Sequence, residues 1–202
     1  MTYQLCRRTI PPDGPRKPNT SLGDPWPAPT VLPHLTQSDD CGDYESELGV
    51  VIGKAAKNVS EADAMSYVLG YTACNDISSR TSQFAQSQWS FSKGFDGACP
   101  IGPVLVSPSL IPDPSKLHLR GLKNGEVLQD CGTDDLIFSI PKLISFLSQS
   151  TTLPAGALII TGTPAGVGIV RKPKVTIKAG DEFAVEILPY IGTLVNTFEN
   201  EK

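Results

Sequence analysis

The stretch that decides the fold runs from residue 43 to residue 80 and reads DYESELGVVIGKAAKNVSEADAMSYVLGYTACNDISSR. Residues 44–52 alternate between polar and apolar side chains and then become wholly apolar, as a strand does when it enters a core. Ser60 is a candidate cap for a short helix, because Asp63 follows at the third position after it. Residues 71–78 form a second apolar run that ends in polar residues. The stretch therefore predicts two strands separated by a short helix.

The rest of the chain continues this pattern. Residues 117–130 are predicted to form a hairpin, since Asn124 and Gly125 suit a type I′ turn. Residues 135–148 carry apolar residues at helical spacing, with Pro141 acceptable only near the helix start. Further strands are predicted at 101–107, 157–162, 174–178, 182–188 and 193–198. We therefore predict a mostly β chain with short helices, an α+β class built as a rolled or sandwiched sheet.

Composition excludes several classes of function. The 202 residues carry a net charge of −4, which gives no electrostatic reason to expect nucleic acid as a partner. No apolar run approaches the ~20 residues of a membrane-spanning helix. The five cysteines are odd in number and scattered, and there are only two histidines, so neither a disulfide framework nor a zinc site is expected.

The N-terminal part differs in composition from the rest. Eight of the 18 prolines lie within the first 33 residues. We predict a proline-rich arm over residues 1–40, either laid over the domain or loose, and a catalytic domain over 41–202. The first residues lack the apolar core of a secretory signal, so the cytoplasm is the expected compartment, with mitochondria as the alternative.

Three carboxylates suggest a cation site. Glu45 and Glu47 are two residues apart in a predicted strand, so their side chains leave the same face. Carboxylates at the mouth of a buried strand are unfavourable unless a metal or a base compensates them. Asp76 ends the neighbouring apolar run, where a strand can deliver it to the same place. Carboxylates without histidine suit a hard cation, Mg²⁺ or Mn²⁺.

Four segments resemble a known family. They are residues 43–80, quoted above, followed by QWSFSKGFDGACPIGP (88–103), GEVLQDCGTDDLIFSIPKLISFL (125–147) and TGTPAGVG (161–168). In this order they resemble the fumarylacetoacetate hydrolase family over roughly residues 17–198. The resemblance implies the mixed β-sandwich roll of that family's C-terminal domain, and it implies homodimers.

The resemblance also implies roles for single residues. Glu45, Glu47 and Asp76 match the family's ligands for Mg²⁺ or Mn²⁺. Lys93 matches the lysine of the K-x-F-D motif, which contacts substrate and metal-shell water and is the expected catalytic residue. Three further positions match the substrate pocket of relatives, with the last of them holding a substrate carboxylate: Arg80, Gln88 and Thr163.

One family feature has no counterpart here. Relatives that hydrolyse acylpyruvates carry an N-Y-x-x-H-x-x-E type segment whose His and Glu activate water, and the 16 residues before Lys17 contain no match. A chain shortened at its N-terminus would give the same picture. Water attack needs a base, whereas enolate formation needs mainly an electron sink, so these residues favour enolate chemistry over hydrolysis.

We therefore expect a Mg²⁺- or Mn²⁺-dependent enzyme acting on a small keto acid or 1,3-diketone through a metal-bound enolate. Carbon–carbon bond cleavage and decarboxylation or tautomerisation stay open. The alternatives are a family member recruited to biosynthesis, for example to assist cyclisation of a diketone, and a non-catalytic binding subunit. The carboxylates argue against a non-catalytic role, because they destabilise the fold when no cation is bound.

Overall fold

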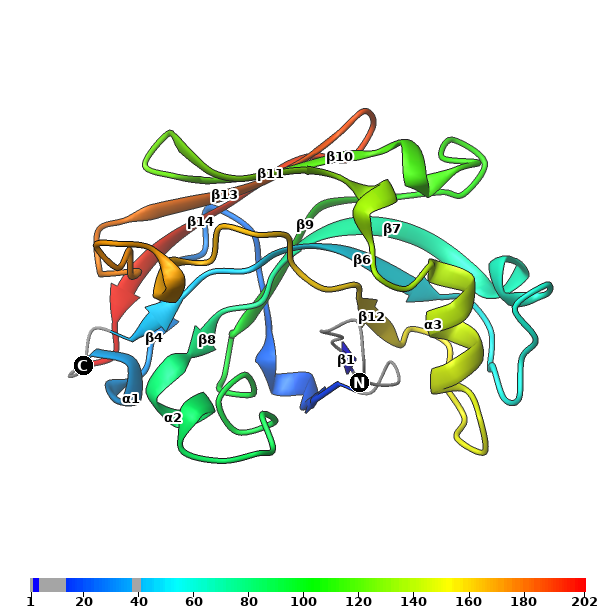
Figure 1. Ribbon diagram of the computed structural model, residues 1–202, viewed down its shortest axis with the longest axis horizontal. Coiled ribbons are helices and arrows are strands. Elements are labelled where there is room, and N and C mark those ends of the chain that lie inside the picture. The colour runs from blue at the N-terminus through cyan, green and yellow to red at the C-terminus, as the bar shows by residue number, and fades with distance from the viewer. Residues whose placement is uncertain (1, 4–13, 38–40) are drawn as a thin grey trace.

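The computed structural model describes residues 2–3, 14–37 and 41–202. Two curled sheets lie face to face (Figure 1). The first has seven strands, in spatial order β2 (Arg16–Lys17), β1 (Thr2–Tyr3), β12 (Leu158–Ile160), β6 (Ser46–Ile52), β7 (Val68–Asn75), β9 (Cys99–Val106) and β3 (Leu22–Gly23). The second has five strands, in spatial order β11 (Glu126–Gly132), β10 (His118–Lys123), β13 (Glu182–Leu188), β14 (Gly192–Asn200) and β4 (Thr30–Leu32).

Short elements complete the fold. A small ladder joins β5 (Gly42–Asp43) to β8 (Ser78–Ser79). The α-helices are α1 (His34–Gln37), α2 (Arg80–Phe84) and α3 (Ile140–Leu147). The 3-10 helices are η1 (Asn19–Ser21), η2 (Ala64–Tyr67), η3 (Pro114–Lys116), η4 (Thr133–Asp135) and η5 (Gly168–Val170). None of the described helices is long and apolar enough to cross a bilayer.

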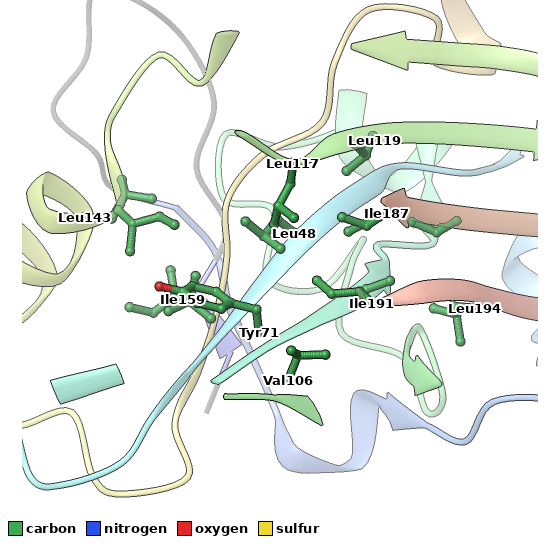
Figure 2. Packing of buried hydrophobic residues seen from close by; sticks show 14 of the residues in the cluster. Leu48, Tyr71, Val106, Leu117, Leu119, Leu143, Ile159, Ile187, Ile191 and Leu194 are labelled. Carbon is green, nitrogen blue, oxygen red and sulfur yellow. The ribbon is translucent and has the colours of Figure 1, made fainter. Parts of the chain in front are cut away.

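The core fills the space between the two sheets. Tyr44 stacks on Phe183 with ring centroids 4.4 Å apart, which ties the start of β6 to the opposite sheet. Figure 2 shows the buried side chains that point into this space, among them Leu48, Tyr71, Leu119, Ile187 and Leu194. The prediction of a mostly β sandwich with short helices is therefore confirmed.

Of three local elements predicted from the sequence, the hairpin is confirmed and the two helices differ from the prediction. The hairpin forms as predicted, and Asn124 and Gly125 have the φ values of 50° and 83° that a type I′ turn requires. The helix predicted from residue 135 begins at Ile140, because the Ser139 hydroxyl caps it by accepting from the Lys142 N–H at 3.3 Å. The helix expected after Ser60 is a turn followed by η2.

The strand predicted at 174–178 is wrong. The Val175 N–H donates to the Gly168 carbonyl, whereas the Ile177 N–H donates to the Gly42 carbonyl. The two bonds lead to separate segments, so no ladder forms and the segment stays a loop. The apolar residues at 175 and 177 suggest a strand, but Val175 is only partly buried and Thr176 is buried, so burial does not alternate along this segment. The pattern also cannot show which backbone groups accept the hydrogen bonds.

The described part of the predicted arm joins the sheets. Strands β2, β3 and β4 pair with β1, β9 and β14 respectively. Residues 1, 4–13 and 38–40 of the arm lie outside the described residues. The division at residue 41 therefore stays a prediction, but the arm residues from 16 to 32 supply edge strands of both sheets.

Candidate metal centre

The three predicted carboxylates meet at the ends of β6 and β7. These strands are antiparallel, and Ser46 pairs with Asn75, so Glu45 and Asp76 lie next to each other. The Asp76 N–H donates to the Glu45 carbonyl at 2.9 Å. One ligand oxygen each from Glu45, Glu47 and Asp76 lies within 4.8 Å of the others, and all three residues are buried.

The cluster lies on the outer face of the first sheet. Leu48 points into the core, so the neighbouring Glu47 points to the opposite face. In Figure 1, β1, β8 and α2 lie on this outer side of β6 and β7, whereas β10 and β11 lie on the core side. The arm and the segment after β7 therefore cover the carboxylates.

Lys93 bridges two of the carboxylates. Its Nζ lies 2.8 Å from Asp76 and 3.1 Å from Glu45, and it donates to the Ser78 hydroxyl at 2.7 Å. Burial by itself lowers the pKa of Lys93, but the charges of Asp76 and Glu45 outweigh burial and raise it. The side chain is therefore held as an ammonium inside the cluster.

Arg80 holds the outer end of the cluster. Its Nε pairs with Asp43 at 2.8 Å, and its Nη1 pairs with Glu45 at 2.7 Å. Burial would raise the pKa of Glu45, but Lys93 and Arg80 lower it to about 2. The Nη2 of Arg80 is buried and has no hydrogen-bond partner within the described part of the chain. A buried donor of this kind is available to an acidic ligand.

At Glu47, burial and the neighbouring carboxylates outweigh the charge of Lys93. The Oε2 of Glu47 accepts from the Gly162 N–H at 2.6 Å. Burial and then the charges of Asp76 and Glu45 raise the pKa of Glu47 well above its usual value. Among the three proposed ligands, Glu47 is therefore the one whose ionised form is least favourable in the folded protein. A further positive charge beside it would stabilise that form.

Two members of the cluster were not found from the sequence. Asp43 accepts from the N–H groups of Tyr44, Gly168 and Ile169 at 2.8–2.9 Å as well as from Arg80. Lys17 contacts the Asp76 carboxylate with its ammonium group and donates to the Ala98 carbonyl at 3.4 Å. The spacing of residues in the sequence predicts a role for neither of them. Lys17 is marked only as the first residue of the family resemblance.

The cluster fits a hard divalent cation. Four buried carboxylates (Asp43, Glu45, Glu47 and Asp76) face three buried cations (Lys17, Arg80 and Lys93). With all four carboxylates ionised, as cation binding requires, the described cluster carries one excess negative charge, and the proposed ligand atoms are all carboxylate oxygens. Oxygen ligands of this type are those that Mg²⁺ and Mn²⁺ prefer.

Two of the predicted substrate-binding residues, Thr163 and Gln88, lie outside the carboxylate cluster. Thr163 follows Gly162, the residue that binds Glu47, and its hydroxyl accepts from Gln129 at 2.7 Å. Thr163 also lines a cavity of about 280 Å³. The core residue Leu48 lines the same cavity, so this cavity lies on the core side of β6. Gln88 is exposed in the loop after α2. The substrate-binding roles of Arg80, Gln88 and Thr163 stay predictions.

Comparison with known proteins assigns the family. A sequence profile described as "Fumarylacetoacetate (FAA) hydrolase C-terminal" matches residues 12–199. The chain belongs to the fumarylacetoacetate hydrolase family. The predicted resemblance is thereby confirmed.

This chain is similar in sequence to individual members of the fumarylacetoacetate hydrolase family. The chain is 48% identical to a caffeoylpyruvate hydrolase of Neonothopanus nambi over 188 residues, covering 92% of this chain and 59% of that protein. It is 45% identical to the mitochondrial oxaloacetate tautomerase fahd2 of Xenopus laevis over 161 residues, covering 79% of this chain and 50% of that protein. The chain thus spans little more than half the length of these relatives.

Solved structures of the family share the fold. A 2-hydroxyhepta-2,4-diene-1,7-dioate isomerase from Mycobacterium marinum matches with a TM-score of 0.86 and 37% identity, covering 99% of this chain and 73% of that one. The three family members compared with this chain are thus named as a hydrolase, a tautomerase and an isomerase.

Proposed function

We propose that the protein is a Mg²⁺- or Mn²⁺-dependent enzyme that enolises a small keto acid or 1,3-diketone, leading to tautomerisation, decarboxylation or carbon–carbon bond cleavage. One observation carries this proposal: ligand oxygens of Glu45, Glu47 and Asp76 lie within 4.8 Å of one another, beside the Lys93 ammonium. These three residues would hold the cation. When bound, the cation supplies a Lewis acid that polarises a substrate carbonyl.

Lys93 stabilises the charge that develops during enolisation. Loss of CO₂, or of a proton to solvent water, beside a carbonyl places negative charge on the carbonyl oxygen, and a fixed ammonium in a buried site offsets that charge. The raised pKa of Lys93 keeps its ammonium protonated in the resting site. The same group can deliver a proton when the enol returns to the ketone.

Arg80 supplies a carboxylate-binding donor. Its Nε and Nη1 are bonded within the protein, which fixes the guanidinium plane, whereas Nη2 is buried without a partner among the described residues. A substrate carboxylate bonded to Nη2 would be oriented by that plane. Thr163 and Gln88 are proposed as further substrate contacts on the family resemblance.

Enolisation suits this site better than hydrolysis. The chain has two histidines, and His118 pairs with Asp130 at the surface while His34 is exposed at the start of α1. No imidazole therefore lies beside the described carboxylates to activate water. Hydrolysis of an acylpyruvate is the second candidate, and it is favoured by the 48% identity to a caffeoylpyruvate hydrolase.

Turnover assays test the proposal. The protein is given oxaloacetate, and separately an acylpyruvate, with and without Mg²⁺, while enol absorbance and CO₂ release are followed. We expect Mg²⁺-dependent turnover that Glu47→Gln abolishes, while Glu61→Gln, at an exposed carboxylate, leaves it unchanged. Turnover that is independent of metal contradicts the proposal. Mg²⁺ binding without turnover of any keto acid favours the non-catalytic alternative, or a specialised biosynthetic substrate.

We also propose a homodimer in the cytoplasm, with mitochondria as the alternative compartment. A mitochondrial relative supports the alternative. Light scattering that gives a mass near 21.6 kDa, that of one chain, would contradict the dimer.

A further inference from the structure

Lys17 is a buried cation that the spacing of residues did not predict and that has no role in the proposed reaction. It lies on β2, and its side chain has no exposed surface, although lysine is seldom buried fully. Its ammonium contacts Oδ1 of Asp76, a residue 59 positions further along the chain. The Ala98 carbonyl is its second partner, at 3.4 Å.

Asp76 is therefore held by ammonium groups on both of its oxygens. Lys17 contacts Oδ1, and Lys93 contacts Oδ2 at 2.8 Å. Lys93 also reaches Glu45 and Ser78, so it links several groups of the site. Lys17 contacts only Asp76 among the described carboxylates of the cluster. Its charge is thus directed at one proposed metal ligand.

The charge of the cluster shows what this arrangement does. When a divalent cation is bound and all four carboxylates are ionised, the three cationic side chains leave the loaded site positive by one. Without Lys17, the loaded site would be neutral. A positive site attracts an anionic keto acid, and in a buried site such charge differences are weakly screened.

We infer that Lys17 is a positioning residue that sets the charge of the site, weakening cation binding so that the loaded site binds an anionic substrate. This inference rests on the proposed function. Repulsion between the ammonium and a divalent cation a few ångströms away opposes metal binding. The same ammonium attracts the substrate anion. Removal of the Lys17 charge therefore has opposite effects on the two ligands.

The test measures both ligands by binding, without turnover. Mn²⁺ affinity is measured by electron paramagnetic resonance, and oxalate, a small dianion that cannot enolise, is titrated calorimetrically into the Mn²⁺-loaded protein. Lys17→Met removes the charge, and Lys17→Gln removes it while keeping donors for Asp76 and Ala98 if the Met variant fails to fold. Lys17→Arg keeps the charge. Lys142→Met is the matched control, since Lys142 forms an exposed ion pair.

The inference predicts opposite changes. Lys17→Met or Lys17→Gln should bind Mn²⁺ at least about tenfold more tightly and oxalate at least about tenfold more weakly. Lys17→Arg should restore both affinities toward those of the wild type, and Lys142→Met should change neither. Mn²⁺ binding that is unchanged or weaker in the uncharged variants overturns the inference while leaving the proposed function intact. A wild-type protein that binds no Mn²⁺ overturns both.

Discussion

The Nζ of Lys93 lies 2.8 Å from Oδ2 of Asp76, although the two residues come from separate segments 17 positions apart. The strand β7 brings Asp76 to the outer face of the first sheet, and the loop that follows α2 returns Lys93 to it. An ammonium and a proposed metal ligand are thus fixed against each other before any substrate arrives. Catalysis by preorganised charge requires this kind of fixed contact.

Lys93→Met should lower kcat by on the order of a hundredfold to a thousandfold, because one preorganised charge is lost. Steady-state kinetics with oxaloacetate and Mg²⁺ would measure the loss, and circular dichroism would check the fold. Lys142→Met, at an exposed lysine, should keep wild-type kcat. A Lys93→Met enzyme with wild-type kcat would rule out the electrostatic role.

Arg80→Met should destabilise the fold by about 3–5 kcal/mol, because it leaves the buried charges of Asp43 and Glu45 without their arginine. Urea denaturation would measure the free energy of unfolding. Arg120→Met is the control, since Arg120 pairs with Glu186 at the surface and its loss should lower the free energy of unfolding far less. Equal losses of unfolding free energy in the two variants would mean that the buried ion pairs of Arg80 stabilise the fold no more than the surface pair of Arg120 does.

Gly168→Ala should destabilise the loop that holds Asp43. A Cβ at this position would collide with the Val175 carbonyl oxygen and lie 2.7 Å from the Asp43 carboxylate. The backbone must shift, and we expect a loss of about 1–3 kcal/mol in unfolding free energy. Gly42→Ala is the control, because its Cβ would meet nothing closer than 3.5 Å. A fully stable Gly168→Ala variant would contradict the described packing.

Asp181 should contribute stability that depends on pH. Burial by itself would raise the pKa of Asp181, but hydrogen bonds from Lys123, Asn124 and the Lys178 N–H lower it. A lowered pKa in the folded state stabilises the protein above the unfolded-state pKa of about 4, and this stabilisation is lost as the pH falls through the folded-state pKa.

The Asp181→Asn variant tests this. It should be less stable than the wild type by about 1 kcal/mol at neutral pH, and the difference should shrink in acid as Asp181 is protonated. Thermal unfolding of both proteins across the acid range would measure the difference. A gap that stays constant with pH would show that the charge of Asp181 is not what stabilises it.

Part of the site could be predicted because it follows the strand period. Glu45 and Glu47 share a face for that reason, and Asp76 follows from its place at the end of the adjacent apolar run. The family resemblance was needed for Lys93, whose position depends on a loop. The structure places Lys93 against Asp76 and Glu45, while its catalytic role remains a proposal.

Lys17 and Asp43 could not be predicted because tertiary packing alone creates their contacts. Lys17 lies on the arm, which is held in place by the pairing of β2 with β1 and by that of β3 with β9. Asp43 is defined by three N–H donors, two of them from the 161–168 motif and the residue after it. The missed loop at 174–178 has the same cause, since its hydrogen bonds go to two distant segments.

The proposed function requires that Glu45, Glu47 and Asp76 together hold one divalent cation. A crystal of the protein grown with Mn²⁺, measured at the manganese absorption edge, tests this directly by anomalous scattering. We expect one anomalous peak within coordination distance of all three carboxylates, and its loss in Glu47→Gln. A crystal with no peak there, or with manganese bound only elsewhere, would show that these carboxylates do not form the proposed cation site.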